Sequence, residues 1–76
     1  MTKDPDTEIR IIKRSVTISG HATSISLEEP FWMALKEIAK YQQRSVNAVI
    51  TKIDTQHPGN LSSALRCYIL EQVRNS

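Results

Sequence analysis

Hydrophobic and polar positions alternate along the first third of the chain. Val16 and Ile18 alternate with serine and threonine, and Ile25 and Leu27 alternate with serines in the same way. A period of two residues is typical of a strand with one buried face. Gly20 separates the two stretches, and glycine readily adopts the positive φ that a tight turn needs. The pattern predicts either a short hairpin or one long strand with a kink at Gly20.

A helical period replaces the alternation at Glu28, Glu29 and Pro30. Proline suits the first turn of a helix, and acidic side chains there complement the positive end of the helix dipole. Beyond this point apolar residues recur on one side, with charged residues opposite. The apolar positions are Phe31, Trp32, Leu35, Ile38 and Ala39. The spacing predicts a helix that fades over residues 41–44.

Two further helices are expected. Ser45 is a good N-cap for the second helix, and His57-Pro58-Gly59 ends it. Either Asn60 or Ser62 can cap a third helix that runs to about Val73. The apolar stripe of the second helix is Val46, Val49, Ile50 and Ile53, and that of the third is Leu61, Leu65, Tyr68 and Ile69. Leu70 and Cys67 lie outside the third stripe.

Length and composition predict one small domain that needs support. Residues 1–8 are polar and without periodicity, so we expect a flexible lead-in over residues 1–9 before a single domain over 10–76. A chain of 76 residues buries only about 60–65% of its unfolded surface. Cys67 is the only cysteine, so it cannot form a disulfide within the chain. Association with a second copy is therefore expected.

The charge is mild, but it is unevenly distributed. The net charge is +2, and Arg10, Lys13 and Arg14 precede a stretch with no acidic residue before Glu28. No apolar run reaches the roughly 18–20 residues of a membrane span, and the first residues lack the apolar core of a signal peptide. We expect a cytoplasmic protein without a membrane partner, and a single free thiol agrees with a reducing compartment.

The residues offer little for catalysis or for metal binding. Ser45, Asp54 and His57 can be drawn as a nucleophile set, but no Gly-x-Ser-x-Gly elbow is present. His21, His57 and Cys67 are widely separated rather than spaced as metal ligands. Two glycines are too few for a phosphate-cradling loop. The sequence therefore predicts no enzyme activity, no metal and no cofactor.

The strand expected over residues 22–27 has one small, hydroxyl-bearing face formed by Ala22, Ser24 and Ser26. Its other face carries Ile25 and Leu27 and must be buried. A lone strand leaves its edges unpaired, so a ribbon formed with a second copy is a natural solution. A two-stranded ribbon has the width that the DNA major groove accepts.

These residues resemble a known family. The string A-T-S-I-S-L-E-E-P-F-W-M-A-L-K-E-I-A, followed by R-S-V-N-A-V-I, is similar to ribbon-helix-helix proteins. The strings R-S-V-T-I-S-G-H-A-T-S-I-S-L-E and N-L-S-S-A-L-R resemble a bacterial subfamily of small proteins with a third C-terminal helix. The resemblance covers roughly residues 13–70. It implies a mainly α fold with a short β ribbon, in an intertwined homodimer whose two chains pair their strands antiparallel in the major groove of double-stranded DNA.

The resemblance also implies roles for individual residues. The expected base-reading residues are Ala22, Ser24 and Ser26. The expected phosphate contacts are the helix start Ser45, Val46 and Asn47, supplemented by Arg10, Lys13, Arg14 and Arg44. The expected dimer core is Ile25, Leu27, Phe31, Trp32, Leu35, Ile38, Val49, Ile50 and Ile53. Ala22 departs from the family pattern, because many members carry Arg or Lys on this strand face.

Two functions follow from the resemblance. The first is a DNA-binding transcriptional regulator, or the DNA-binding antitoxin of a toxin–antitoxin pair. The second is a ribbon-helix-helix dimer used for protein interaction, with the third helix and Leu70 docking a partner. A further alternative concerns the site, because the segment starting at Leu61 also resembles a second ribbon-helix-helix helix. In that reading Ser62 replaces Ser45 as the phosphate-binding cap.

Overall fold

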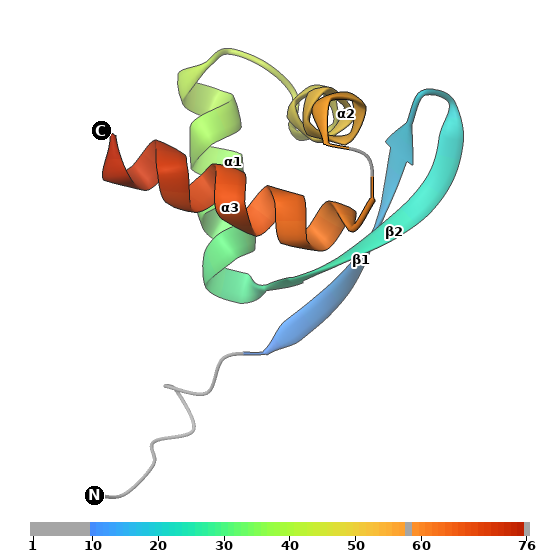
Figure 1. The fold of residues 1–76 in the computed structure, drawn as a ribbon, viewed down its shortest axis with the longest axis horizontal. Helices are drawn as coiled ribbons and strands as arrows, with labels where there is room; N and C mark the ends of the chain where they lie inside the picture. The colour runs from blue at the N-terminus through green and yellow to red at the C-terminus, as the bar shows by residue number, and fades with distance from the viewer. Residues whose placement is uncertain (1–9, 58, 76) are drawn as a thin grey trace, which may run out of the picture.

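Two strands precede three helices in the part of the chain that the computed structural model describes, residues 10–57 and 59–75. The order is β1 (Ile11–Ile18), β2 (His21–Glu28), α1 (Glu29–Tyr41), α2 (Val46–Gln56) and α3 (Leu61–Arg74) (Figure 1). The predicted fold class, a short β ribbon followed by ribbon-helix-helix helices and an extra C-terminal helix, is confirmed. The lead-in predicted over residues 1–9 lies outside the described residues.

The two strands form an antiparallel hairpin, which settles the alternative between a hairpin and a kinked strand. Ile18 pairs with His21, so Ser19 and Gly20 make the whole turn. Both turn residues have positive φ, 51° at Ser19 and 81° at Gly20. Positive φ at both central positions is the mark of a type I′ turn, whose twist matches that of the flanking strands.

Within the single chain, β1 and β2 form a two-stranded ribbon. β2 pairs with β1 along its whole length, from Ile11 opposite Glu28 to Ile18 opposite His21. Local pairing is favoured because a two-residue turn closes the smallest possible loop and costs little chain entropy. The alternation over 11–18 supplies a complete second strand, so β2 needs no strand from a partner on this edge.

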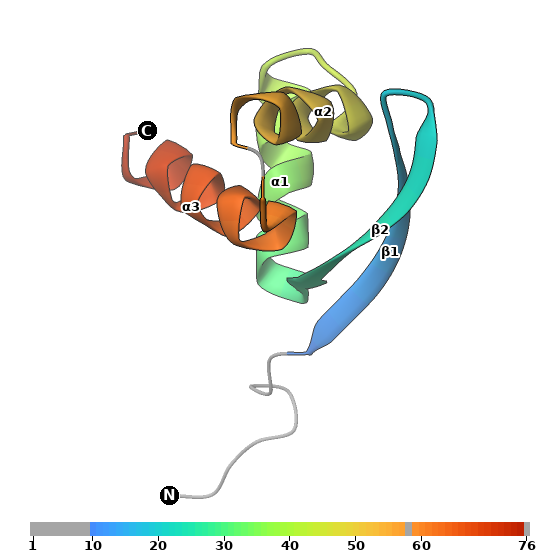
Figure 2. The same ribbon diagram turned by 45° about the vertical axis from the view of Figure 1, so that its right-hand side comes forward.

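The helices cover one face of the ribbon. Figure 2 shows the curved hairpin on one side of the molecule and the three helices together on the other. Alternate strand residues point into this layer, and the helices contribute their apolar stripes. The buried core is Val16, Ile18, Ile25, Leu27, Leu35, Ala39, Val49, Ile50, Ile53, Leu65 and Ile69. Among the described residues, no polar or charged residue is fully buried.

The expected dimer-core residues divide into two groups by their burial in a single chain. Ile25, Leu27, Leu35, Val49, Ile50 and Ile53 are at most 2% exposed. Phe31, Trp32 and Ile38 are only partly buried and pack against this core. The six buried residues therefore pack within a single chain. Leu65 and Ile69 of α3 belong to the same core cluster.

The helix ends agree with the expected capping residues. The Ser45 hydroxyl accepts a hydrogen bond from the Ala48 amide at 3.0 Å, and the Asn60 side chain accepts one from the Ser63 amide at 3.0 Å. Asn60 rather than Ser62 therefore caps α3. These caps fix where α2 and α3 begin and so set the short connections before them.

The turn from α1 to α2 is tight. Gln43 has φ 58°, and the amides of Gln43 and Arg44 donate to the carbonyls of Lys40 and Ala39 at 3.0 and 2.9 Å. This pair of bonds is a Schellman motif, which satisfies the last carbonyl groups of a helix. The motif directs the chain straight into the cap at Ser45.

Candidate nucleic-acid interface

The face of the hairpin that points away from the helices is here named the outer ribbon face. Its residues face one another in pairs across the two strands, because directly opposed residues of an antiparallel pair share a face. The pairs are Ile11 and Glu28, Lys13 and Ser26, Ser15 and Ser24, and Thr17 and Ala22. All are exposed except Ser26 and Glu28, which are half-buried.

Small side chains and hydroxyl groups dominate this face. Ala22 and Ser24 lie exposed on it, and Ser26 lies beside them. Ser15 and Thr17 stand on the same face directly opposite Ser24 and Ala22. The resemblance implied base-reading roles for Ala22, Ser24 and Ser26 alone, so Ser15 and Thr17 were not among the expected site residues. Ser15 and Thr17 alternate with the buried residues Val16 and Ile18, and this alternation predicts that Ser15 and Thr17 point outward.

Lys13 also belongs to the outer ribbon face, opposite Ser26. Lys13 was expected to contact phosphate from a segment before the ribbon, whereas the structure places it within β1. Its side chain is exposed, and no ion pair joins it to any residue of 10–57 or 59–75. A free ammonium group therefore lies among the hydroxyl groups.

Arg14 points to the opposite face of the ribbon. Its guanidinium lies 4.4 Å from the centroid of the Trp32 ring and donates to the Glu29 carboxylate at 2.7 Å. Only 23% of its side chain is exposed, and Nη1 is buried with no hydrogen-bond partner among the described residues. Arg14 thus ties the inner side of β1 to the first turn of α1, while Lys13 remains on the outer ribbon face.

The other expected phosphate contacts lie at exposed positions. Arg10 and Arg44 are exposed and form no ion pair within the described part of the chain. At the start of α2 the Ser45 hydroxyl accepts a hydrogen bond from the Ala48 amide, and the Ser45 carbonyl accepts one from the Val49 amide. The amides of Val46 and Asn47 have no backbone acceptor in the described residues. Free amides at the positive end of a helix suit an anion such as a phosphate group.

The outer edge of β2 is occupied by side chains of α3. The Ser26 amide donates to the Ser62 hydroxyl at 3.2 Å, and Arg66 donates to the Ser26 carbonyl at 3.4 Å. Arg66 also donates to both carboxylate oxygens of Glu28, at 2.8 and 3.3 Å. The hydrogen bond from Arg66 holds the pKa of Glu28 below its usual value. Ser62 is therefore a strand contact, not a helix cap.

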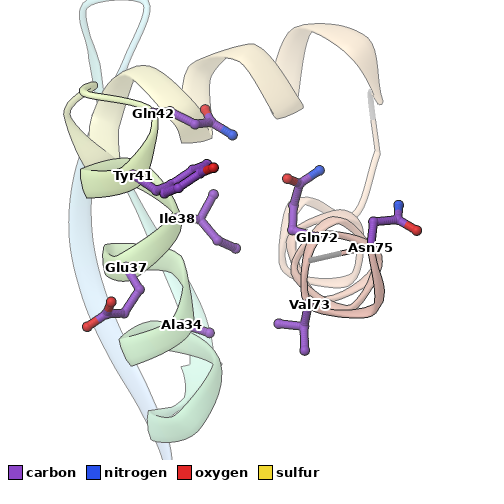
Figure 3. A pocket seen from close by; sticks show the side chains of 8 residues that line it. All are labelled: Ala34, Glu37, Ile38, Tyr41, Gln42, Gln72, Val73 and Asn75. Atoms are coloured by element: carbon purple, nitrogen blue, oxygen red, sulfur yellow. The ribbon is translucent and has the colours of Figure 1, made fainter.

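An open groove runs between α1 and the C-terminal half of α3 (Figure 3). Ile38 and Tyr41 point from α1 toward α3, and Val73 lies across from them. The Gln42 amide donates to the Tyr68 hydroxyl at 2.8 Å and links the two helices. Tyr41 is 91% exposed, and Leu70, on α3, is 52% exposed. Apolar surface is thus displayed on the helical side of the molecule.

Within residues 10–57 and 59–75, no three His, Cys, Asp or Glu side chains gather as a metal site would require. None of the helices in that part of the chain has the length and apolar character needed to cross a membrane.

Comparison with known proteins gives one match. A family model described as a ribbon-helix-helix domain matches residues 11–73. No curated protein and no solved structure shows a significant match to the chain. The matched residues extend from the first residue of β1 into the last turn of α3, so both strands and the third helix belong to the matched domain.

Proposed function

Because this chain belongs to the ribbon-helix-helix family, we propose that it is a transcriptional regulator that binds DNA through its outer ribbon face. Members of the family are typically DNA-binding regulators or antitoxins, they generally form dimers, and they are generally not enzymes. The observation that carries the proposal is the exposed, hydroxyl-bearing face of the hairpin, with Lys13 as a free cation on it.

The chemistry of this face suits the edges of bases. Serine and threonine hydroxyls donate to or accept from base edges, and a lysine ammonium donates to O6 and N7 of guanine. Lys13 therefore supplies the base-reading cation that Ala22 lacks. A specific contact of this kind contributes about 1–3 kcal/mol of discrimination between bases. The reading set that we propose is Lys13, Ser15, Thr17, Ala22 and Ser24, with half-buried Ser26 at its margin.

We assign the phosphate contacts to Arg10, which precedes β1, and to the residues at the start of α2. The exposed guanidinium groups of Arg10 and Arg44 and the amides of Val46 and Asn47 suit the DNA backbone, which positions a protein without reading sequence. Arg14 is given a structural role instead, because Glu29 and Trp32 hold its guanidinium on the inner face.

The proposal is tested by selecting genomic fragments with the purified protein and sequencing those retained. Binding to a selected duplex is expected to weaken steeply between 50 and 200 mM salt, with a slope of about 0.9 per neutralised phosphate. The Lys13→Met variant should lose discrimination between the selected and a scrambled duplex. The matched Arg44→Met variant should weaken binding to both duplexes equally.

The serine pair provides the second arm of this test. Ser15 and Ser24 are both exposed and directly opposed, so replacing both with alanine removes two hydroxyls without disturbing the core. The preference among selected duplexes should change while the salt slope stays the same. Unchanged preference in both this variant and Lys13→Met would show that the outer ribbon face is not the reader.

A second candidate is supported by the exposed apolar residues Met33, Tyr41 and Leu70 on α1 and α3. In this reading the domain binds a protein partner through its helical side, as an antitoxin or interaction module. A stable dimer that binds neither selected nor random duplex at low salt would favour it over the DNA-binding proposal.

A further inference from the structure

We propose that Arg66 of α3 determines how well the outer ribbon face discriminates between DNA sequences, although it is not one of the reading residues. It does so by holding the carboxylate of Glu28, which would otherwise pair with Lys13, the free cation of that face. Arg66 is thus a positioning residue that acts through Glu28. The effect on DNA rests on the proposed function, but the competition for Lys13 is a property of the protein alone and is tested without DNA.

Arg66 lies at the outer edge of β2, where it contacts two residues. Its Nε donates to Oε1 of Glu28 at 2.8 Å and its Nη2 donates to Oε2 at 3.3 Å, so both carboxylate oxygens accept a hydrogen bond. Nη2 also donates to the Ser26 carbonyl at 3.4 Å. The side chains of Arg66 and Glu28 are 30% and 21% exposed, so solvent reaches the pair only in part. A contact through two guanidinium nitrogens fixes the direction of the carboxylate as well as its position.

Glu28 is the only acidic residue in the four opposed pairs of the outer ribbon face, and Lys13 is the only basic one. Glu28 is opposite Ile11, and the next pair on the same face is Lys13 and Ser26. Lys13 and Glu28 are therefore diagonal neighbours, about 7–8 Å apart at Cα, which is within reach of long side chains. Arg14 is held by Glu29 on the inner side of the ribbon and does not reach this face. Lys13 is the cation that a released Glu28 carboxylate would meet there.

Arg66 therefore acts on the reading face in two ways. It leaves the Lys13 ammonium available for O6 and N7 of guanine, which is an effect on sequence discrimination. It also neutralises a carboxylate that would otherwise repel the phosphates of a bound duplex, which is an effect on binding to every sequence and depends on salt. Loss of Arg66 should reduce discrimination as well as affinity.

Acylation of lysines in the free protein tests the competition for Lys13. The rate of reaction with an acetyl N-hydroxysuccinimide ester at low salt is read by mass spectrometry, with the exposed Lys36 and Lys40 of α1 as internal references. Pairing with a carboxylate keeps an ammonium protonated and unreactive. In Arg66→Met the relative rate at Lys13 should fall roughly two- to fivefold, the range of a surface ion pair, and adding Glu28→Gln should restore it. An unchanged rate in Arg66→Met, or a slow rate in the double variant, would overturn the proposal.

Discrimination between a selected and a scrambled duplex is the second readout. Arg66→Met should reduce the ratio of the two affinities about tenfold, the effect of one modest base contact. Arg66→Lys keeps a cation beside Glu28 and should retain most of the ratio. The Arg66→Met, Glu28→Gln double variant should recover the wild-type ratio, although β2 still lacks the contact at Ser26. A purely structural role for Arg66 predicts that the double variant stays impaired, and that result would overturn the proposal.

Ser62→Ala is the matched control for the position of β2. The Ser62 hydroxyl accepts a hydrogen bond from the Ser26 amide at 3.2 Å, so this variant loosens the same strand and leaves Glu28 with Arg66. It should change neither the Lys13 rate nor the affinity ratio. Losses as large as those of Arg66→Met would show that strand position is responsible, and would overturn the proposal.

A second variant covers the case in which Arg66→Met does not fold. Arg66→Gln keeps a donor for the Ser26 carbonyl but removes the charge, so it should give the same loss at Lys13 and in the affinity ratio. If Lys13→Met discriminates as well as the wild type, the proposed function fails. The acylation rates then still decide whether Arg66 keeps Lys13 free.

Discussion

Replacing Arg14 with methionine separates a structural arginine from a DNA-contacting one. The structure places the guanidinium against Trp32 and Glu29 on the inner side of the ribbon. Methionine keeps most of the apolar stem that packs there and removes the charge. The variant should therefore lose stability, while its folded form keeps the DNA affinity of the wild type.

The expected loss can be worked from the two contacts. The pair with Glu29 is 2.7 Å long, but the side chains are 23% and 45% exposed, so solvent screening limits it to about 0.5 kcal/mol. The contact with the Trp32 ring, at 4.4 Å, contributes about 0.5–1 kcal/mol. Nη1 is buried without an acceptor among residues 10–57 and 59–75, and its removal offsets part of this loss. The net expectation is about 1 kcal/mol, or roughly 4–8 °C in Tm for a domain of this size.

Thermal unfolding by circular dichroism measures the loss of stability. Fluorescence anisotropy on a selected duplex measures the DNA affinity. Arg44→Met is the matched control, because Arg44 is exposed and forms no ion pair among the described residues. It should leave Tm within about 2 °C and reduce the salt slope by about 0.9 if Arg44 contacts one phosphate. An Arg14→Met variant with unchanged Tm and a reduced salt slope would refute the structural assignment.

Three further outcomes are expected. Gln43→Gly should raise the free energy of unfolding by about 0.5–1 kcal/mol in urea titrations, because Gln43 holds a φ of 58° that glycine adopts without strain; a loss of stability would contradict this. Since the Arg66 hydrogen bond lowers the folded-state pKa of Glu28, this pair stabilises the fold above the ordinary pKa of 4.5, and its contribution is lost as pH falls through the lower folded value. The stability difference between wild type and Glu28→Gln should therefore shrink as the pH is lowered from 7 to 3, and a constant difference would argue against the pair. Leu65 is 0% exposed, so Leu65→Ala should cost about 3 kcal/mol and lower the midpoint of one cooperative transition, whereas a separate transition for α3 would show that the chain is not a single domain.

Much of this fold was predictable because its elements have strong local signals. The buried Val16, Ile18, Ile25 and Leu27 follow from alternation, and the cap at Ser45 follows from its position before an apolar stripe. Local patterns of this kind identify a strand or a helix, and they also identify its buried face.

Contacts between distant residues were not predictable in the same way. The pairing of β2 with β1 could not be derived from alternation, because the alternation is the same whether the partner strand belongs to the same chain or to another. The charge of Arg14 suggested a contact with DNA. Its position on the inner face of β1 instead places its guanidinium against Trp32. Ser62 and Arg66, which contact the edge of β2 at Ser26, lie 36 and 40 positions from it in the sequence. No local pattern predicts contacts over such separations.

The type I′ turn at Ser19 and Gly20 also has a kinetic consequence. A ribbon built from two chains forms in a bimolecular step, so its rate and its population fall with dilution. Here β1 and β2 are joined by a turn of two residues, and hairpins of this kind form in about 1–10 µs regardless of concentration. The surface that we assign to DNA is therefore complete in each newly made chain, and dilution affects only whether two such surfaces act together.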